Sequence, residues 1–259
     1  MKVFKKVICC IVIILLMCTS KVYAKESSEV HFINTRQSDC ILIKSKDFNI
    51  LIDTGAEESA DKVLDYLSSN DVDRINYIFI THYHNDHYGG LEKILKYKKV
   101  DKVFIPSHPD VMRDIIYRYL YVSGVDVSFI KDEFKIKKND IKLITIKAKD
   151  YDQEIENNNA IVIAGKINGR RYIFASDIEK EREKEIVKEG IIGKCDILKL
   201  PHHGLNTSSS NLFLRRVRPL TVIITCNGEE SPDEEIIEKL KKMRINIIRT
   251  DVDGDIVIK

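Results

Sequence analysis

Residues 81–90 read THYHNDHYGG and place three histidines and an aspartate within six positions. The chain has only seven histidines in 259 residues, so the concentration is local. The mostly apolar run at 75–80 directly before it predicts a strand buried on both faces. Where an extended chain leaves that strand, residues i and i+2 point the same way, so His82 and His84 can bind one cation together. Asp86 and His87 follow where the chain turns toward a helix, and they are predicted to reach a second position nearby.

Imidazole and carboxylate ligands of this kind suit zinc or a comparable first-row ion. A solvated histidine-rich loop is the alternative, but the position between a buried strand and a helix favours a metal site. Four side chains from one loop cannot complete two metal positions, so further ligands are expected later in the chain. His31 begins a predicted strand and is interpreted as structural, whereas His108 follows a short strand and is a further candidate ligand.

Two later segments supply those further candidates. Asp177 follows an apolar strand predicted at 172–175, and its two oxygens can bridge two cations. Aspartate is also a favoured N-cap, and a helix is predicted next, so both roles stay open at this point. His202 and His203 follow a strand predicted at 196–200. A surface histidine pair is the alternative there, but the repeated placement at strand ends favours metal ligation.

The rest of the sequence alternates between strand and helix patterns. Short runs rich in β-branched residues predict strands, and apolar residues three and four apart predict helices. Asn168-Gly169 predicts a two-residue hairpin turn. The strands are predicted at 30–33, 40–43, 49–52, 75–80, 102–105, 125–130, 141–146, 160–167, 171–175, 196–200, 221–226, 245–248 and 255–258. The helices are predicted at 57–69, 91–97, 110–122, 179–189, 209–217 and 233–243. This order predicts an α/β protein with two layered sheets and helices outside.

Several motifs resemble one known superfamily. THYHNDHYGG resembles the T-H-x-H-x-D-H-x-G-G signature of the metallo-β-lactamase superfamily. HFINTRQSDCILIKSKDFNILIDTG, NNNAIVI, YIFASDIEKERE, CDILKLPHHG and IIRTDVDGDIVI resemble, in the same order, blocks of one subgroup. That subgroup is the extracellular hydrolase domain of ComEC-type DNA-uptake proteins and their free-standing relatives. The resemblance implies an αββα sandwich, with two packed β-sheets, helices on the outer faces, and one or two metal ions at one edge of the sheets.

The resemblance also implies roles for individual residues. It makes Asp177 a bridging ligand and one histidine of the 202/203 pair a ligand, and it places Asp53 where a carboxylate supports the histidine-bearing loop. The chain departs from the pattern at several points. Arg36-Gln37-Ser38-Asp39 stands where relatives usually have Gly-Gln-Gly-Asp, so glycine-only conformations are excluded in that loop. Three other positions also differ from the family pattern. Ser176 stands in place of a glycine, Ser231 in place of a histidine late in the pattern, and the asparagines at 157–159 in place of another histidine. One metal position is therefore expected to have fewer protein ligands.

The predicted chemistry is metal-assisted hydrolysis, in which a cation lowers the pKa of its bound water from about 15.7 toward 7 and polarises the scissile bond. Asp86 is also expected to orient the nucleophile, and His203 to donate to the developing negative charge. The predicted metal ligands are His82, His84, Asp86, His87, Asp177 and His202. The expected cofactor is Zn²⁺, as one or two ions, with Mn²⁺ or Fe²⁺ as alternatives.

The resemblance ranks the substrates as well. Phosphodiesters and phosphate esters come first, of nucleic-acid or cell-envelope phosphocholine type, followed by lactones and carboxylic esters, and then by β-lactams. The expected partner is therefore a small-molecule or polymeric ester substrate. Two rival functions stay open: a metal-binding envelope module with reduced catalysis, and a redox di-iron site on the same fold.

The N-terminal residues have the pattern of an export signal. Lys2, Lys5 and Lys6 precede an uncharged run at 7–20, and small residues end the segment near Ala24. Fourteen uncharged residues are fewer than the roughly 20 of a membrane span. A signal peptide is therefore predicted at 1–24, with an uncleaved N-terminal anchor as the alternative, and a hydrolase domain at 25–259. This predicts transient contact with the secretion machinery and a secreted or cell-envelope location.

Charge and cysteine content exclude other classes. Residues 1–24 hold four lysines and no acidic residue, so the net charge of +2 becomes −2 without them. The domain thus lacks the bulk basic character of a nucleic-acid-binding protein, although nucleic acid can still be a substrate. Cys40, Cys195 and Cys226 are too few and too widely spaced for a disulfide framework or a thiolate metal site.

Overall fold

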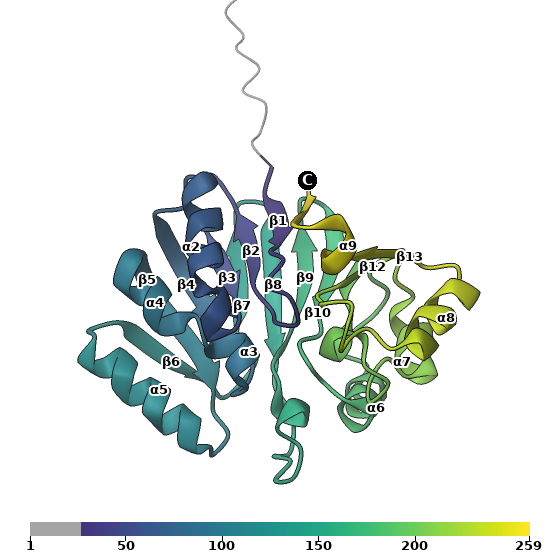
Figure 1. Ribbon diagram of the computed structural model, residues 1–259. Coiled ribbons are helices and arrows are strands. Elements are labelled where there is room, and N and C mark those ends of the chain that lie inside the picture. Colours follow the sequence, from purple (N-terminus) through teal and green to yellow (C-terminus); the bar gives the residue numbers. More distant parts are fainter. Residues whose placement is uncertain (1–26) are drawn as a thin grey trace, which may run out of the picture.

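The computed structural model describes residues 27–259, in which two β-sheets pack face to face between two layers of helices (Figure 1). The expected αββα sandwich is confirmed. The signal or anchor predicted at 1–24 lies outside the described residues. Within 27–259, no helix combines the length and the apolar character that a membrane span requires.

The first sheet has the strand order β14-β1-β2-β3-β4-β5-β6. Its first three pairings, from β14 to β3, are antiparallel, and the next three, from β3 to β6, are parallel. The parallel strands end at the same edge of the sheet, where the chain continues into Asp53 and into the segment 81–87. Its strands are β1 Glu29–Phe32, β2 Ile41–Lys44, β3 Ile50–Ile52, β4 Arg74–Phe79, β5 Lys99–Pro106, β6 Asp126–Ile130 and β14 Ile256–Ile258.

The second sheet repeats this plan in the order β13-β12-β11-β10-β9-β8-β7. Strands β7 to β10 pair antiparallel, and strands β10 to β13 pair parallel. Asp177 follows β10 and the histidine pair follows β11, so both come from the same edge of this sheet. Its strands are β7 Lys135–Lys138, β8 Ile141–Ile146, β9 Val162–Ile167, β10 Arg170–Phe174, β11 Ile197–Lys199, β12 Thr221–Ile224 and β13 Asn246–Arg249.

Three apolar clusters hold these layers together. One lies between the sheets and includes Phe32, Phe79 and Phe174, one lies under the helices of the first sheet, and one under those of the second. Figure 1 shows α2, α4 and α5 beside the first sheet and α6, α7 and α8 beside the second. The helices are α2 Ala60–Ser69, α3 Asn85–Tyr88, α4 Leu91–Tyr97, α5 Val111–Val122, α6 Lys180–Glu189, α7 Asn211–Val217, α8 Glu234–Lys242 and α9 Thr250–Asp253. The 3₁₀ turns are η1 Glu57–Ser59, η2 Glu156–Asn159 and η3 Pro201–Gly204. Both sheets and these three clusters lie within residues 27–259.

Local sequence signals explain particular elements. The predicted hairpin joins β9 to β10, and both Asn168 and Gly169 have positive φ, as its two-residue turn requires. Strand β7 was not predicted, because a single buried residue, Ile136, stands among exposed lysines. Arg36 stands where the family pattern has a glycine and adopts a φ of 65°, in the left-handed region that favours glycine. The arginine therefore takes up the same kind of backbone conformation that a glycine would allow.

Candidate metal centre

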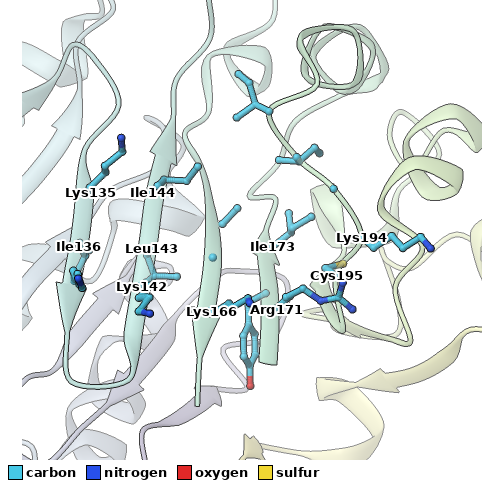
Figure 2. Close-up of a pocket in the computed structure, with 17 residues that line it drawn as sticks. Lys135, Ile136, Lys142, Leu143, Ile144, Lys166, Arg171, Ile173, Lys194 and Cys195 are labelled. Carbon is cyan, nitrogen blue, oxygen red and sulfur yellow. The ribbon is translucent and has the colours of Figure 1, made fainter. Parts of the chain in front are cut away.

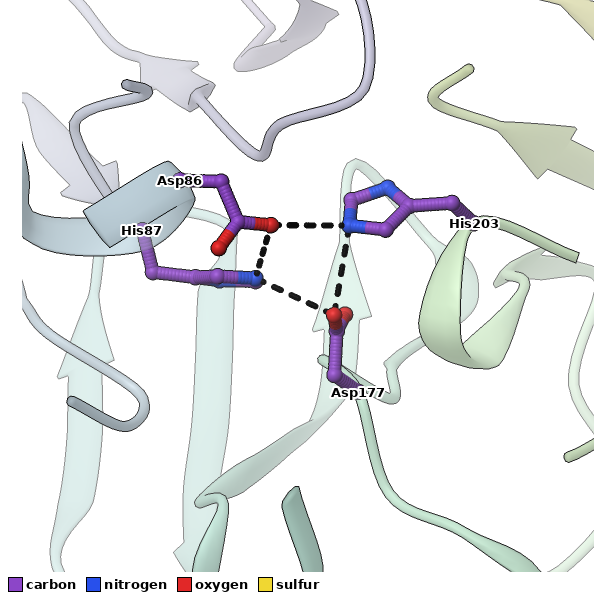
Figure 3. A group of neighbouring side chains, drawn as sticks. All are labelled: Asp86, His87, Asp177 and His203. Carbon is purple, nitrogen blue, oxygen red and sulfur yellow. Dashed lines mark hydrogen bonds and ion pairs between the residues drawn. The ribbon is translucent and has the colours of Figure 1, made fainter. Parts of the chain in front are cut away.

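Four side chains converge where the carboxyl ends of strands from both sheets meet. One ligand atom from each of Asp86, His87, Asp177 and His203 lies within 4.8 Å of the others (Figure 3). His203 Nε2 lies 3.2 Å from Asp86 Oδ2 and 3.2 Å from Asp177 Oδ2. His87 Nε2 lies 3.3 Å from Asp86 Oδ2 and 3.2 Å from Asp177 Oδ2. The sequence motif and two distant segments thus meet at one point, which we call the four-residue centre.

Asp53 fixes the orientation of His87. Its Oδ2 lies 2.8 Å from His87 Nδ1, and it also accepts hydrogen bonds from the backbone N–H and the hydroxyl of Thr81, each at 2.8 Å. A carboxylate only accepts, so Nδ1 of His87 carries the proton and Nε2 faces the centre. Asp53 therefore takes the supporting position that the resemblance implied.

A backbone carbonyl orients His203 in the same way. Its Nδ1 lies 2.8 Å from the carbonyl oxygen of Thr225, at the end of β12. The ring therefore donates from Nδ1 and directs Nε2 toward Asp86 and Asp177. Both imidazoles are held by a partner behind them, which is the usual arrangement around metal-binding histidines.

The electrostatics of the centre favour positive charge. Burial alone would lower the pKa of His87, but the carboxylates of Asp177, Asp86 and Asp53 outweigh it and raise that pKa well above its ordinary value. The pKa of His203 rises to about 9 for the same reason, against its burial and mainly through Asp177. Conversely, burial would raise the pKa of Asp177, but His203, His87 and Lys199 hold it well below its usual range.

These residues fit a divalent cation. His87 Nε2 is buried and has no hydrogen-bond partner within the described part of the chain, although two carboxylate oxygens lie near it. A cation among the four side chains would satisfy this nitrogen and both carboxylates together. Two imidazoles and two carboxylates are suitable ligands for zinc, manganese or iron.

His82 and His84 form an adjacent pair instead of joining this centre. His82 Nε2 lies 3.1 Å from His84 Nδ1, and the rings of His82 and His87 are 4.1 Å apart. Burial, followed by the charge of His87, lowers the pKa of His82 well below its ordinary value, which keeps it in the neutral form that binds metals. Among residues 27–259, no third histidine, cysteine or carboxylate ligand atom completes a group around this pair. A cation bound to this pair would therefore have fewer protein ligands than one at the four-residue centre.

Asn157 lies where the sequence lacks a further histidine. It is buried in η2, its Nδ2 donates to Glu179 Oε1 at 3.1 Å, and the same nitrogen lies 3.4 Å from His202 Nε2. Its Oδ1 has no hydrogen-bond partner in the part of the chain described here. A buried amide oxygen without a hydrogen-bond partner in the described residues therefore lies on the same side chain that approaches His202.

Only one of the two histidines of η3 belongs to the four-residue centre. His203 belongs to the four-residue centre, whereas His202 is partly exposed outside it, with Nδ1 2.8 Å from Thr207 Oγ1. Both residues have left-handed backbone angles within this short turn. The geometry favours His203 as the ligand and leaves His202 as the remaining histidine. The sequence prediction named His202 first and left the choice within the pair open, and this geometry favours the other member.

A buried lysine supports the centre and was not predicted. Lys199 Nζ contacts a carboxylate oxygen of Asp39, lies 3.3 Å from Asp177 Oδ1, and donates to the carbonyl oxygen of Ser176 at 3.2 Å. Burial lowers the pKa of Lys199, but Asp39 and Asp177 outweigh that effect and raise it. The signal for this role was a charged residue between two apolar ones, Leu198 and Leu200, near the end of the predicted strand.

The other two histidines lie elsewhere. His31 is buried on β1, where Nδ1 lies 2.8 Å from Tyr66 Oη, consistent with a structural role. His108 Nε2 lies 2.9 Å from Glu156 Oε1 and does not join either group of candidate ligands within 27–259. A second group of candidate metal ligands consists of Asp39, Asp53 and His87 and shares His87 with the four-residue centre. In this group, Lys199 already balances the charge of Asp39.

Comparison with known proteins identifies the family. The sequence profile of the metallo-beta-lactamase superfamily matches residues 33–226. The chain belongs to this superfamily. It has the metallo-β-lactamase fold, and the superfamily together with the four-residue centre implies divalent metal ions.

Curated relatives confirm the expected subgroup. The chain is 27% identical over 274 residues to ComE operon protein 3 of Bacillus subtilis (strain 168), covering 96% of this chain and 35% of that protein. It is 24% identical over 221 residues to competence protein ComA of Neisseria gonorrhoeae, covering 83% and 30%. The chain therefore spans about a third of the length of the curated relatives it matches.

Solved structures share the fold. The metallo-beta-lactamase fold protein YhfI from Bacillus subtilis matches 90% of this chain and 100% of its own, with a TM-score of 0.64 and 10% identity. CmlA, a diiron beta-hydroxylase from Streptomyces venezuelae, matches 90% of this chain and 54% of its own, with a TM-score of 0.58 and 15% identity. At these identities the likeness concerns the fold alone.

Proposed function

We propose that this protein hydrolyses phosphodiester or phosphate ester bonds with a divalent cation, zinc first, held by Asp86, His87, Asp177 and His203. One observation carries the proposal: these four side chains converge within 4.8 Å, and buried His87 Nε2 has no hydrogen-bond partner in residues 27–259. A cation bound there would supply Lewis acidity and lower the pKa of the attacking water. His82 and His84 would hold a second cation more weakly.

The protein's own residues would orient the reactants. The side chain of Asp86 is 32% exposed, so one of its oxygens can accept a hydrogen bond from the attacking water. His202 is partly exposed, with Thr207 Oγ1 fixing its Nδ1 and Glu179 Oε1 3.7 Å from the same nitrogen. Its Nε2 lies 3.4 Å from the amide nitrogen of Asn157, a donor, and burial lowers the pKa of His202, so in the neutral ring Nε2 would accept a proton from the reactants.

The substrate class rests on the relatives. One of them is named competence protein ComA, and the resemblance to DNA-uptake proteins favours phosphodiesters over lactones and carboxylic esters. We also propose that the domain acts outside the cytoplasm or in the envelope, on the basis of the export-signal pattern at 1–24.

Metal analysis combined with hydrolysis assays tests the proposal. The purified protein is expected to hold at least one divalent ion and to hydrolyse a bis-aryl phosphate or DNA in preference to a lactone. The double variant His84→Ala, Asp86→Ala is expected to lose kcat/KM on the order of 100-fold or more. Asp132→Ala, which removes an exposed carboxylate elsewhere, serves as the control and is expected to keep full activity.

Three outcomes would contradict the proposal in different ways. Equal activity of the double variant and the parent would remove the proposed site. Faster hydrolysis of a lactone than of any phosphate ester would replace the substrate class. Bound metal without turnover on any ester would favour the metal-binding module, for which the asparagine at position 157 is the specific structural observation.

A further inference from the structure

Four cationic side chains form a row across the outer face of the second sheet, which we call the cationic row. Lys137 on β7 pairs with Lys142 on β8, Lys142 pairs with Lys166 on β9, and Lys166 pairs with Arg171 on β10. Directly paired residues on neighbouring strands point to the same face. Four successive strands therefore present a positive charge at the same level of the sheet.

An apolar trough adjoins the cationic row. Two residues further along the same strands, Ile144 pairs with Ala164, and Ala164 pairs with Ile173. The segment 191–195 closes one side, and the resulting cavity has a volume of about 410 Å³ (Figure 2). Six of its 17 lining residues are cationic and none is acidic. Ile191 at its rim is 44% exposed.

The row carries charge that the fold itself does not balance. Arg171 pairs with Asp196 at 2.6 Å, but Lys137, Lys142 and Lys166 are exposed and have no ion pair within the described residues. Like charges directly opposite on neighbouring strands destabilise a sheet. This concentration stands out because the domain as a whole is near neutral. The row therefore presents positive charge to solvent on this face.

We propose that this face docks onto an anionic phospholipid membrane, with the cationic row against the headgroups and Ile191 and the apolar trough against the acyl-chain boundary. Cationic side chains beside exposed apolar ones are the combination that binds an anionic bilayer surface. A single-stranded nucleic acid would instead require aromatic side chains for base stacking. The aromatic residue lining the trough, Tyr172, belongs to the core between the sheets.

The membrane surface would be separate from the metal centre. Arg171 lies near the start of β10, whereas Asp177 follows its end, six residues later. At about 3.3 Å per residue, the row and the centre lie roughly 20 Å apart along the strand direction. Docking at one end of the sheet would leave the other end open to substrate.

Vesicle binding by residues 27–259, which contain both sheets and the three apolar clusters, tests the proposal. The protein is expected to sediment with phosphatidylcholine vesicles containing about 30% phosphatidylglycerol, not with pure phosphatidylcholine, and to be released at about 1 M salt. The triple variant K137Q, K142Q, K166Q is expected to bind about 100-fold more weakly, or roughly fivefold per cation. Its thermal midpoint should stay equal or rise, because mutual repulsion is removed. Ile191→Ser is expected to weaken binding about tenfold.

A second triple variant provides the matched control. K96Q, K131Q and K242Q removes the same charge from exposed lysines on other elements and is expected to change vesicle binding by less than about twofold. Equal loss in both triple variants would overturn the proposal, because net charge alone would then explain the binding. It would also be overturned if the parent ignored phosphatidylglycerol, or if it bound a short DNA duplex more tightly than vesicles through the same three lysines.

Discussion

Removing the ammonium group of Lys199 should destabilise the protein strongly. Lys199 Nζ is fully buried and is the cationic partner of two buried carboxylates, Asp39 and Asp177. The substitution Lys199→Met preserves much of the side-chain volume but leaves both carboxylates without their cation. Because Asp177 belongs to the four-residue centre, the same change is expected to alter the response of the protein to divalent metal.

The expected magnitude follows from the burial of the pair. Deleting one member of a buried ion pair typically costs about 3–5 kcal/mol of unfolding free energy. For a domain of this size, each kcal/mol corresponds to a fall in Tm of about 2–4 °C. Lys199→Met should therefore lower Tm by roughly 6–20 °C. A bound divalent cation should restore part of this loss, because it compensates Asp177 but leaves Asp39 unpaired.

Thermal and urea unfolding, with and without Zn²⁺ and with a chelator, provide the assay. The double variant Asp39→Asn, Lys199→Met removes both charges of the closer pair, and the amide introduced in place of the Asp39 carboxylate can still accept the hydrogen bond that Thr225 Oγ1 donates at 2.6 Å. It should therefore be more stable than the single variant. Lys242→Met, at an exposed site on α8, is the control and should stay within about 0.5 kcal/mol of the parent. A single variant as stable as the parent, or a double variant less stable than the single, would refute the reasoning.

Three further predictions concern other parts of the molecule. Asp53→Asn should weaken divalent-metal binding about 10–100-fold through misorientation of His87, as measured by competition with a chelating dye; unchanged affinity would contradict the supporting role. Burial raises the pKa of Cys195 to about 12, so a thiol reagent at pH 8 should label it only on unfolding, and rapid labelling of the native protein would show otherwise. Burial would raise the pKa of Glu156, but His108 and other hydrogen-bond partners outweigh burial and lower it. The ionised carboxylate therefore stabilises the fold at pH values above the pKa that Glu156 has in the unfolded chain. This stabilisation is lost as the pH falls through the lower pKa of the folded state. Glu156→Gln should therefore cost about 1–2 kcal/mol at pH 7 and progressively less below about pH 4; a cost that is the same at both pH values would rule this out.

Much of the fold follows from local sequence signals. Runs of β-branched residues predicted the strands of both sheets, because a strand buried between two layers must be apolar almost throughout. The motif at 81–90 and Asp177 were identifiable because each follows such a strand directly. Strand β7 was not predicted, since an exposed edge strand needs only one buried residue and therefore has no detectable alternation.

The roles within the site depended on long-range geometry that the sequence does not display. Residues Asp39 and Lys199 are far apart in the chain, and only the packing of the two sheets brings their charges into contact. The difference between His202 and His203 appears only in their contacts: His203 Nδ1 is held by the carbonyl oxygen of Thr225 and its Nε2 lies beside Asp86 and Asp177. Spacing alone cannot distinguish between two adjacent histidines, so the sequence left open which of them is the ligand.

Left-handed backbone angles concentrate around the four-residue centre and indicate what the surrounding network does. Asp53, Ser176, His202 and His203 all have φ between 49° and 57°, and each follows the carboxyl end of a strand that leads into the site. Such angles cost of order 1–3 kcal/mol each in residues other than glycine, and they persist only where neighbouring contacts determine the conformation. Those contacts are present: the backbone N–H of Asp53 donates to the carbonyl of Phe79 at 2.8 Å, and the carbonyl of Ser176 accepts from both the backbone N–H of His202 at 3.1 Å and Lys199 Nζ. Lys199 thus stabilises both the turn that carries Asp177 and the negative charge of the Asp177 carboxylate. The geometry of the metal centre therefore depends on the packing of the core beneath it.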